Sequence, residues 1–110
     1  MSEWTRVAVK DDVIENMPLS ITVKGKPIGL FRVGEEVFAL NDICSHDHAL
    51  LSTGFQDGYH IECPLHQAVF DVRTGNHLSP PAECGVQAFP VRIEGDDILV
   101  DVSKIPGVGH

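Results

Sequence analysis

Closely spaced turn signals divide this chain into short segments. They lie at residues 24–27, 34–36, 57–58, 73–76 and 95–97, and each contains a glycine beside polar or charged residues. Glycine supplies the positive φ that many tight turns require, so such clusters punctuate strands rather than helices. No segment shows the periodicity of a long helix. The sequence therefore predicts an all-β fold, an antiparallel barrel or sandwich.

The segments between the turns have the composition of strands. Many alternate apolar and polar residues and are rich in valine, isoleucine and phenylalanine. Two hairpins are expected, one around residues 34–36 and one around residues 95–97. The expected strands are residues 4–9, 19–23, 28–33, 37–40, 59–63, 68–72, 86–94 and 98–102.

Size and composition indicate one small domain. The chain has 110 residues, of which 43% are hydrophobic, enough for one compact core and too few for two. We therefore expect a single domain over residues 1–110. A domain of this size is marginal on core burial alone, so a bound metal centre would add stability.

The charge balance excludes some partners. Sixteen acidic residues against eight basic ones give a net charge of −8, which argues against binding to nucleic acid or to anionic lipid. No apolar run reaches the roughly 18–20 residues of a membrane helix, and residues 1–12 lack the features of a signal peptide. We expect a cytoplasmic protein, where its three cysteines serve metal binding or chemistry rather than disulfides.

Two mixed pairs of metal-ligand residues stand out. Cys44-Ser45-His46 and Cys63-Pro64-Leu65-His66 each combine a thiol with an imidazole, and each lies just beyond or at the end of an expected strand. Side by side, the two loops would form a pocket of four ligands at one end of the barrel. Tetrahedral zinc accepts two cysteines and two histidines, and so does a [2Fe–2S] centre in which histidines replace two thiolates. Zinc fingers usually separate the two residue types, so the mixed pairs favour the iron–sulfur centre.

The chain resembles the Rieske ferredoxins of bacterial ring-hydroxylating dioxygenase systems. The resemblance runs from about residue 4 to residue 102 and includes the Cys-x-His and Cys-x-x-His motifs at the spacing of that family. The matching stretches outside the first motif are residues 28–33, 37–40, 62–66, 70–71, 74–75 and 89–96. It implies a Rieske-type antiparallel barrel or sandwich with two cluster-binding loops, about 44–51 and 63–70, and a covering loop, about 77–85, that contains Pro80-Pro81.

The resemblance also implies a cofactor, a site and a function. One Rieske [2Fe–2S] cluster would be bound by Cys44 and Cys63 on one iron and by His46 and His66 on the other. The protein would be an electron carrier, not an enzyme. It would pass single electrons from an NAD(P)H-dependent flavin reductase to a terminal oxygenase in aromatic-compound degradation, and we expect it to act as a monomer.

Two differences from high-potential Rieske proteins are informative. Those proteins carry a disulfide between the cluster loops, where this chain has Ala49 and Leu65, and hydroxyl groups near the cluster, where it has Ala68 and Phe70. Hydrogen bonds to the sulfurs raise the potential, so their loss predicts a value near the low end of the Rieske range, about −150 mV. The expected docking tip comprises His46, Asp47, His48, Leu65, Gln67 and Pro80-Pro81.

Other functions are consistent with parts of the sequence. A Rieske-like small subunit of a larger reductase, such as an assimilatory nitrite reductase, would carry the same motif. A zinc-stabilised binding module would use the same four residues without iron. An oxygenase subunit would need a second iron site and a catalytic domain, for which the chain is too short. Cys84 is expected to be a thiol outside the site, and His60 and His77 surface residues.

Overall fold

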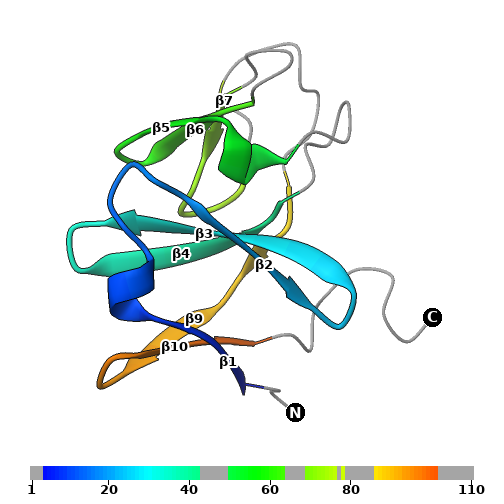
Figure 1. Cartoon of the computed structure of the whole chain (residues 1–110). Helices are drawn as coiled ribbons and strands as arrows, with labels where there is room; N and C mark the ends of the chain where they lie inside the picture. Colours follow the sequence, from blue (N-terminus) through cyan, green and yellow to red (C-terminus); the bar gives the residue numbers. More distant parts are fainter. Residues whose placement is uncertain (1–3, 43–49, 64–68, 77, 79–85, 102–110) are drawn as a thin grey trace.

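The regular secondary structure of the described residues is almost entirely antiparallel strands, as Figure 1 shows. The computed structural model describes residues 4–42, 50–63, 69–76, 78 and 86–101. Within these ranges the only helical elements are two short 3-10 turns, η1 (Lys10–Asp12) and η2 (Leu51–Thr53). None of the described helices is long and apolar enough to cross a membrane. The expected all-β antiparallel fold is confirmed.

Two sheets form the base of the molecule. The first has the strand order β1-β10-β9 and the second β2-β3-β4-β8. The predicted hairpins are both present, since β3 pairs with β4 across Val33↔Glu36 and β9 pairs with β10 across Asp97↔Glu94. The strands of these sheets are β1 (Trp4–Val9), β2 (Leu19–Val23), β3 (Lys26–Val33), β4 (Glu36–Asn41), β8 (Ala88–Phe89), β9 (Val91–Glu94) and β10 (Asp97–Asp101).

A third sheet is inserted between β4 and β8 and lies at the opposite end of the molecule from β9 and β10 in Figure 1. It consists of β5 (Phe55–Asp57), β6 (His60–Glu62) and β7 (Val69–Asp71), in that order. The insertion leaves the second sheet intact, because the amide N–H of Asn41 donates to the carbonyl oxygen of Gln87 at 2.8 Å. The chain thus leaves and rejoins the second sheet at neighbouring points.

The second sheet is buried on both faces, which explains the continuous apolar character of β3. Ile28 and Leu30 pack toward the first sheet, whereas Phe31 packs toward the third. Strands buried on both faces lose the apolar–polar alternation of a surface strand. The core facing the first sheet contains Val13, Val23, Ile28, Leu30, Val37, Ala39, Phe89, Ile98 and Val100, and the core facing the third contains Phe31, Leu40, Leu51, Ile61, Cys63, Phe70 and Val72.

Two expected boundaries were wrong. No strand was expected before the turn at residues 57–58, but Phe55–Asp57 forms β5 there, and the turn itself begins at Gly58, whose φ is +59°. Gln56 holds β5 in place from the buried side, because its amide nitrogen donates to the carbonyl oxygens of Arg32 and Gly58 at 3.1 and 3.0 Å. The strand expected over residues 86–94 is broken at Pro90, where the chain passes from β8 in the second sheet to β9 in the first. Proline has no N–H for a sheet ladder, so it suits this change of sheet.

Candidate functional site

Of the four expected ligands, only Cys63 lies in the described part of the chain. Cys44, His46 and His66 lie outside it, as do most of the residues expected at the docking tip and in the covering loop. The structure therefore informs the site through the residues on which its loops begin and end. The other expectations that lie outside the described residues concern Asp47, His48, Ala49, Leu65, Gln67, Ala68, His77, Pro80-Pro81 and Cys84.

Cys63 directly follows β6 and is fully buried. Its thiol is free of any disulfide and belongs to the apolar cluster of Ile61 and Phe70. A buried thiol can pack as a small apolar group or act as a metal ligand, and the surrounding chain decides between them. Here Cys63 is the first residue after β6 and begins the segment that contains His66. This position suits a cluster ligand.

The ends of the first ligand loop are held together by Asp42. Its carboxyl group is fully buried and accepts hydrogen bonds from the Ser52 amide at 2.7 Å and the Ser52 hydroxyl at 2.6 Å. Its backbone carbonyl accepts a further bond from the Leu51 amide at 2.7 Å. Residues 42 and 51–52, which flank the segment containing Cys44 and His46, are thus fixed to one another.

The ends of the second ligand loop are closed by strand pairing. Glu62 and Val69 are register partners in β6 and β7, so the segment containing Cys63 and His66 spans one antiparallel connection. Gly54, which follows the first loop, lies against the backbone of Glu62: a Cβ on Gly54 would come within 2.0 Å of the Glu62 carbonyl oxygen. This contact brings Gly54, just after the first loop, against Glu62, just before the second, an arrangement that a pocket built from both loops would need.

The segment expected to cover the cluster is anchored beside the same sheet. The Leu78 amide donates to the carbonyl oxygen of Val69 at 2.6 Å, and the Val86 amide donates to that of Gly75 at 2.8 Å. Gly75 has φ +80°, and a Cβ there would come within 2.0 Å of the Val86 carbonyl oxygen. The described ends of residues 79–85 therefore lie next to β7 and to the turn that follows it.

A polar and aromatic bracket joins the third sheet to β4. The Arg73 guanidinium donates to both carboxyl oxygens of Asp71, at 3.0 and 2.8 Å, and lies 4.2 Å from the centroid of the Tyr59 ring. The Tyr59 hydroxyl donates to Glu36 on β4 at 3.2 Å. The Arg73 bond lowers the pKa of Asp71, and the Glu36 bond raises the pKa of Tyr59. This bracket was not predicted from the sequence.

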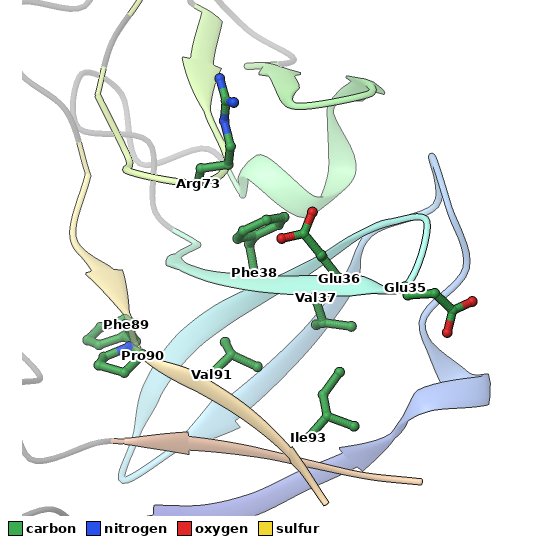
Figure 2. Close-up of a pocket in the computed structure, with 9 residues that line it drawn as sticks. All are labelled: Glu35, Glu36, Val37, Phe38, Arg73, Phe89, Pro90, Val91 and Ile93. Carbon is green, nitrogen blue, oxygen red and sulfur yellow. The ribbon is translucent and has the colours of Figure 1, made fainter. Parts of the chain in front are cut away.

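A groove of about 490 Å³ lies beneath this bracket, between β4 and β9 (Figure 2). Its walls are largely apolar, and its charged groups already have partners: Glu35 pairs with Lys10, Glu36 accepts the Tyr59 hydroxyl, and Arg73 pairs with Asp71. Among its described lining residues there is neither cysteine nor histidine. The residues lining it are Glu35, Glu36, Val37, Phe38, Arg73, Phe89, Pro90, Val91 and Ile93.

Comparison with known sequences gives one family and close relatives. Residues 3–90 match the model of the Rieske [2Fe-2S] domain. The ferredoxin component of the naphthalene 1,2-dioxygenase system of Pseudomonas putida is 38% identical over 101 residues, which are 92% of this chain and 97% of that protein.

Solved structures give the same fold. The ferredoxin of carbazole 1,9a-dioxygenase from Nocardioides aromaticivorans IC177 superposes with a TM-score of 0.86 at 37% identity, covering 89% of this chain and 96% of the other. A chain in the complex of reduced oxygenase and oxidised ferredoxin of carbazole 1,9a-dioxygenase superposes with a TM-score of 0.84 at 32% identity, covering 89% and 92%.

Proposed function

This chain belongs to the Rieske [2Fe–2S] family, and on that premise we propose that Cys44 and Cys63 bind one iron of its cluster and His46 and His66 the other. Three observations support this assignment. The four residues have the mixed spacing of the motif, Cys63 is a buried free thiol at the end of β6, and the bases of the two loops meet at Gly54 and Glu62. The residues present therefore fit the family's cofactor. The cluster supplies one-electron transfer when bound.

The protein is an electron carrier, a ferredoxin that serves a terminal oxygenase. Ferredoxin components of dioxygenase systems match it over nearly their whole length, 97% in the naphthalene system, so the chain corresponds to the carrier and not to the oxygenase. The complex of oxygenase and ferredoxin in the carbazole system supports the direction of transfer. This function depends on the chain's own residues to bind the cluster, to limit its contact with water and to present it to a partner.

Finer features complete the proposal. The electron donor is an NAD(P)H-dependent flavin reductase, as the resemblance to Rieske ferredoxins implies. The oxygenase acts on an aromatic compound, in keeping with the naphthalene and carbazole dioxygenases named for the relatives. The carrier works as a monomer in the cytoplasm. The net charge of −8 supports weak and rapid docking to basic partners rather than a permanent complex.

Metal analysis and spectroscopy test the ligand assignment. The purified chain is expected to hold two irons and two sulfides and, when reduced, to give the EPR spectrum of a Rieske centre. Cys44→Ser, Cys63→Ser, His46→Ala and His66→Ala should each abolish this signal. Cys84→Ser and His60→Gln are the matched controls and should retain it. One zinc per chain, with no iron after anaerobic reconstitution, would contradict the proposal.

A further inference from the structure

The third sheet has one buried face and one exposed face. Gln56, Ile61 and Phe70 point into the core from β5, β6 and β7. Their neighbours along each strand point the other way, because successive side chains of a strand alternate between faces. We call this outward surface the outer face of the third sheet; it comprises Phe55, Asp57, His60, Glu62, Val69 and Asp71.

An aromatic ring stands exposed on this face. Phe55 is 72% exposed, more than any other large apolar side chain in the described residues. The strand register places Phe55 beside Glu62, and Glu62 beside Val69. A shallow hollow of about 200 Å³ lies over these strands and is lined by Phe55, Asp57, His60, Glu62 and Val69. Exposed aromatic residues next to a hollow are common anchors of protein interfaces.

The charges around the ring are acidic and available. Within the described residues no ion pair involves Asp57 or Glu62, whereas Asp71 at the edge of the face is paired with Arg73. Among the residues that the structure describes, the face therefore presents an aromatic anchor flanked by two carboxylates that no lysine or arginine pairs with, and His60 lies opposite Asp57 in the register. The complementary surface is an apolar socket bordered by lysine or arginine side chains.

This face also adjoins the ligand loop. Glu62 directly precedes Cys63, and Val69 pairs with Glu62 to close the segment between them. A protein docked on the outer face would contact the two strand ends, at Glu62 and Val69, from which the segment with Cys63 and His66 departs. Electron exchange requires such proximity to the cluster.

From these observations we propose that the outer face of the third sheet is a docking surface for the terminal oxygenase, with Phe55 as its apolar anchor and Asp57 and Glu62 as its charged flanks. The inference rests on the proposed function, since it needs the chain to serve an oxygenase. It adds a surface on β5 and β6 to the loop tip expected from the sequence.

The test compares docking and chemistry in surface variants of the holoprotein. Phe55→Ser should raise the Kd for the purified oxygenase component of the naphthalene 1,2-dioxygenase system about tenfold or more, as truncation of an interface anchor does. Asp57→Asn combined with Glu62→Gln should raise it less, and that effect should vanish at high salt. Met17→Ser, which removes a 63% exposed side chain from another part of the surface, is the matched control.

Each outcome is decisive. Iron content and the visible spectrum should be unchanged in every variant, and reduction by the flavin reductase should keep its wild-type rate. If the wild type supports oxygenase turnover and Phe55→Ser binds equally well, the docking surface is wrong while the proposed function stands. If Phe55→Ser impairs only the reductase step, the partner assignment is wrong. A wild-type chain that neither binds the oxygenase nor supports turnover would overturn the proposed function and the docking surface together.

Discussion

Gly54 lies so close to Glu62 that the backbone carbonyl of Glu62 occupies the space a side chain on Gly54 would need. A Cβ on Gly54 would come within 2.0 Å of the Glu62 carbonyl oxygen. The φ of Gly54 is −83°, which other residues adopt, so the close approach and not the backbone angle requires glycine here. The contact fixes the end of the first ligand loop against the start of the second.

Gly54→Ala is therefore expected to destabilise the fold by about 3 kcal/mol, because the Glu62 backbone must move to admit the methyl group. Urea unfolding measures the loss, and iron release to a chelator should be faster in the variant. Gly34→Ala is the control, since Gly34 has φ +60° but nothing within 4 Å of its Cβ position. It should cost only about 1 kcal/mol. Equal losses in the two variants would show that the contact with Glu62 is unimportant.

The hydrogen bonds of Asp42 predict a second effect at the first loop. Ser52→Ala removes the hydroxyl that donates to the buried Asp42 carboxyl group at 2.6 Å and leaves an acceptor less well satisfied. We expect a loss of about 1.5–3 kcal/mol in the free energy of unfolding. Thr53→Ala removes a neighbouring, exposed hydroxyl bond to Leu50 and should cost less than about 1 kcal/mol. A larger loss of unfolding free energy in Thr53→Ala than in Ser52→Ala would show that the Asp42 hydrogen bonds do not hold the ends of this loop together.

The pairing of Asp71 with Arg73 predicts a dependence of stability on pH. The Arg73 bond lowers the pKa of the Asp71 carboxyl group in the folded state. As the pH falls, this carboxyl group is therefore protonated at a higher pH in the unfolded chain than in the folded one. The pair's contribution is fully present above the unfolded pKa of about 3.9 and is lost as the pH falls through the lower folded value. Asp71→Asn should therefore have a lower free energy of unfolding than the wild type at pH 6, and this difference should shrink below about pH 4. A difference that stays constant down to pH 3 would contradict the assignment.

Phe70 predicts an effect on the redox potential. Its ring is fully buried in the cluster that contains Cys63, and the resemblance places hydroxyl donors near this position in high-potential relatives. We expect the wild-type midpoint in the lower part of the Rieske range, near or below about −100 mV, and a higher value in Phe70→Tyr, because a donor to the sulfurs stabilises the reduced state. Voltammetry measures both. Phe38→Tyr on β4 is the control and should leave the potential unchanged.

The sequence predicted the features that depend on local chemistry. The hairpin turns at Gly34-Glu35 and Gly95-Asp96 follow from residues adjacent in the chain, and both are present. The strand at Phe55–Asp57 was missed because Gly54 and Gly58 resemble two ends of one loop. Only Gly58 has the positive φ of a turn glycine, whereas Gly54 is required by contact with a distant strand.

The remaining features depend on residues far apart in the chain. The bracket of Glu36, Tyr59 and Arg73 joins three separate elements, and no periodicity within one segment reports such a contact. The candidate site could be predicted only in part from the sequence. The spacing of cysteine and histidine predicted Cys63 as a ligand, and the structure places it buried at a strand end, but the assignment of all four ligands remains a prediction.

The hydrogen bond between Asn41 and Gln87 has an evolutionary consequence. Because the chain leaves and rejoins the second sheet one hydrogen bond apart, the scaffold does not depend on how long the intervening segment is. The entropic cost of closing such a segment grows only slowly with its length. Insertions, deletions or exchange of everything from β5 to β7 would leave the pairing of β4 with β8 in register. The same two-sheet base can therefore accept a different inserted module, provided that the new module covers Phe31 and Leu40, which pack against the third sheet.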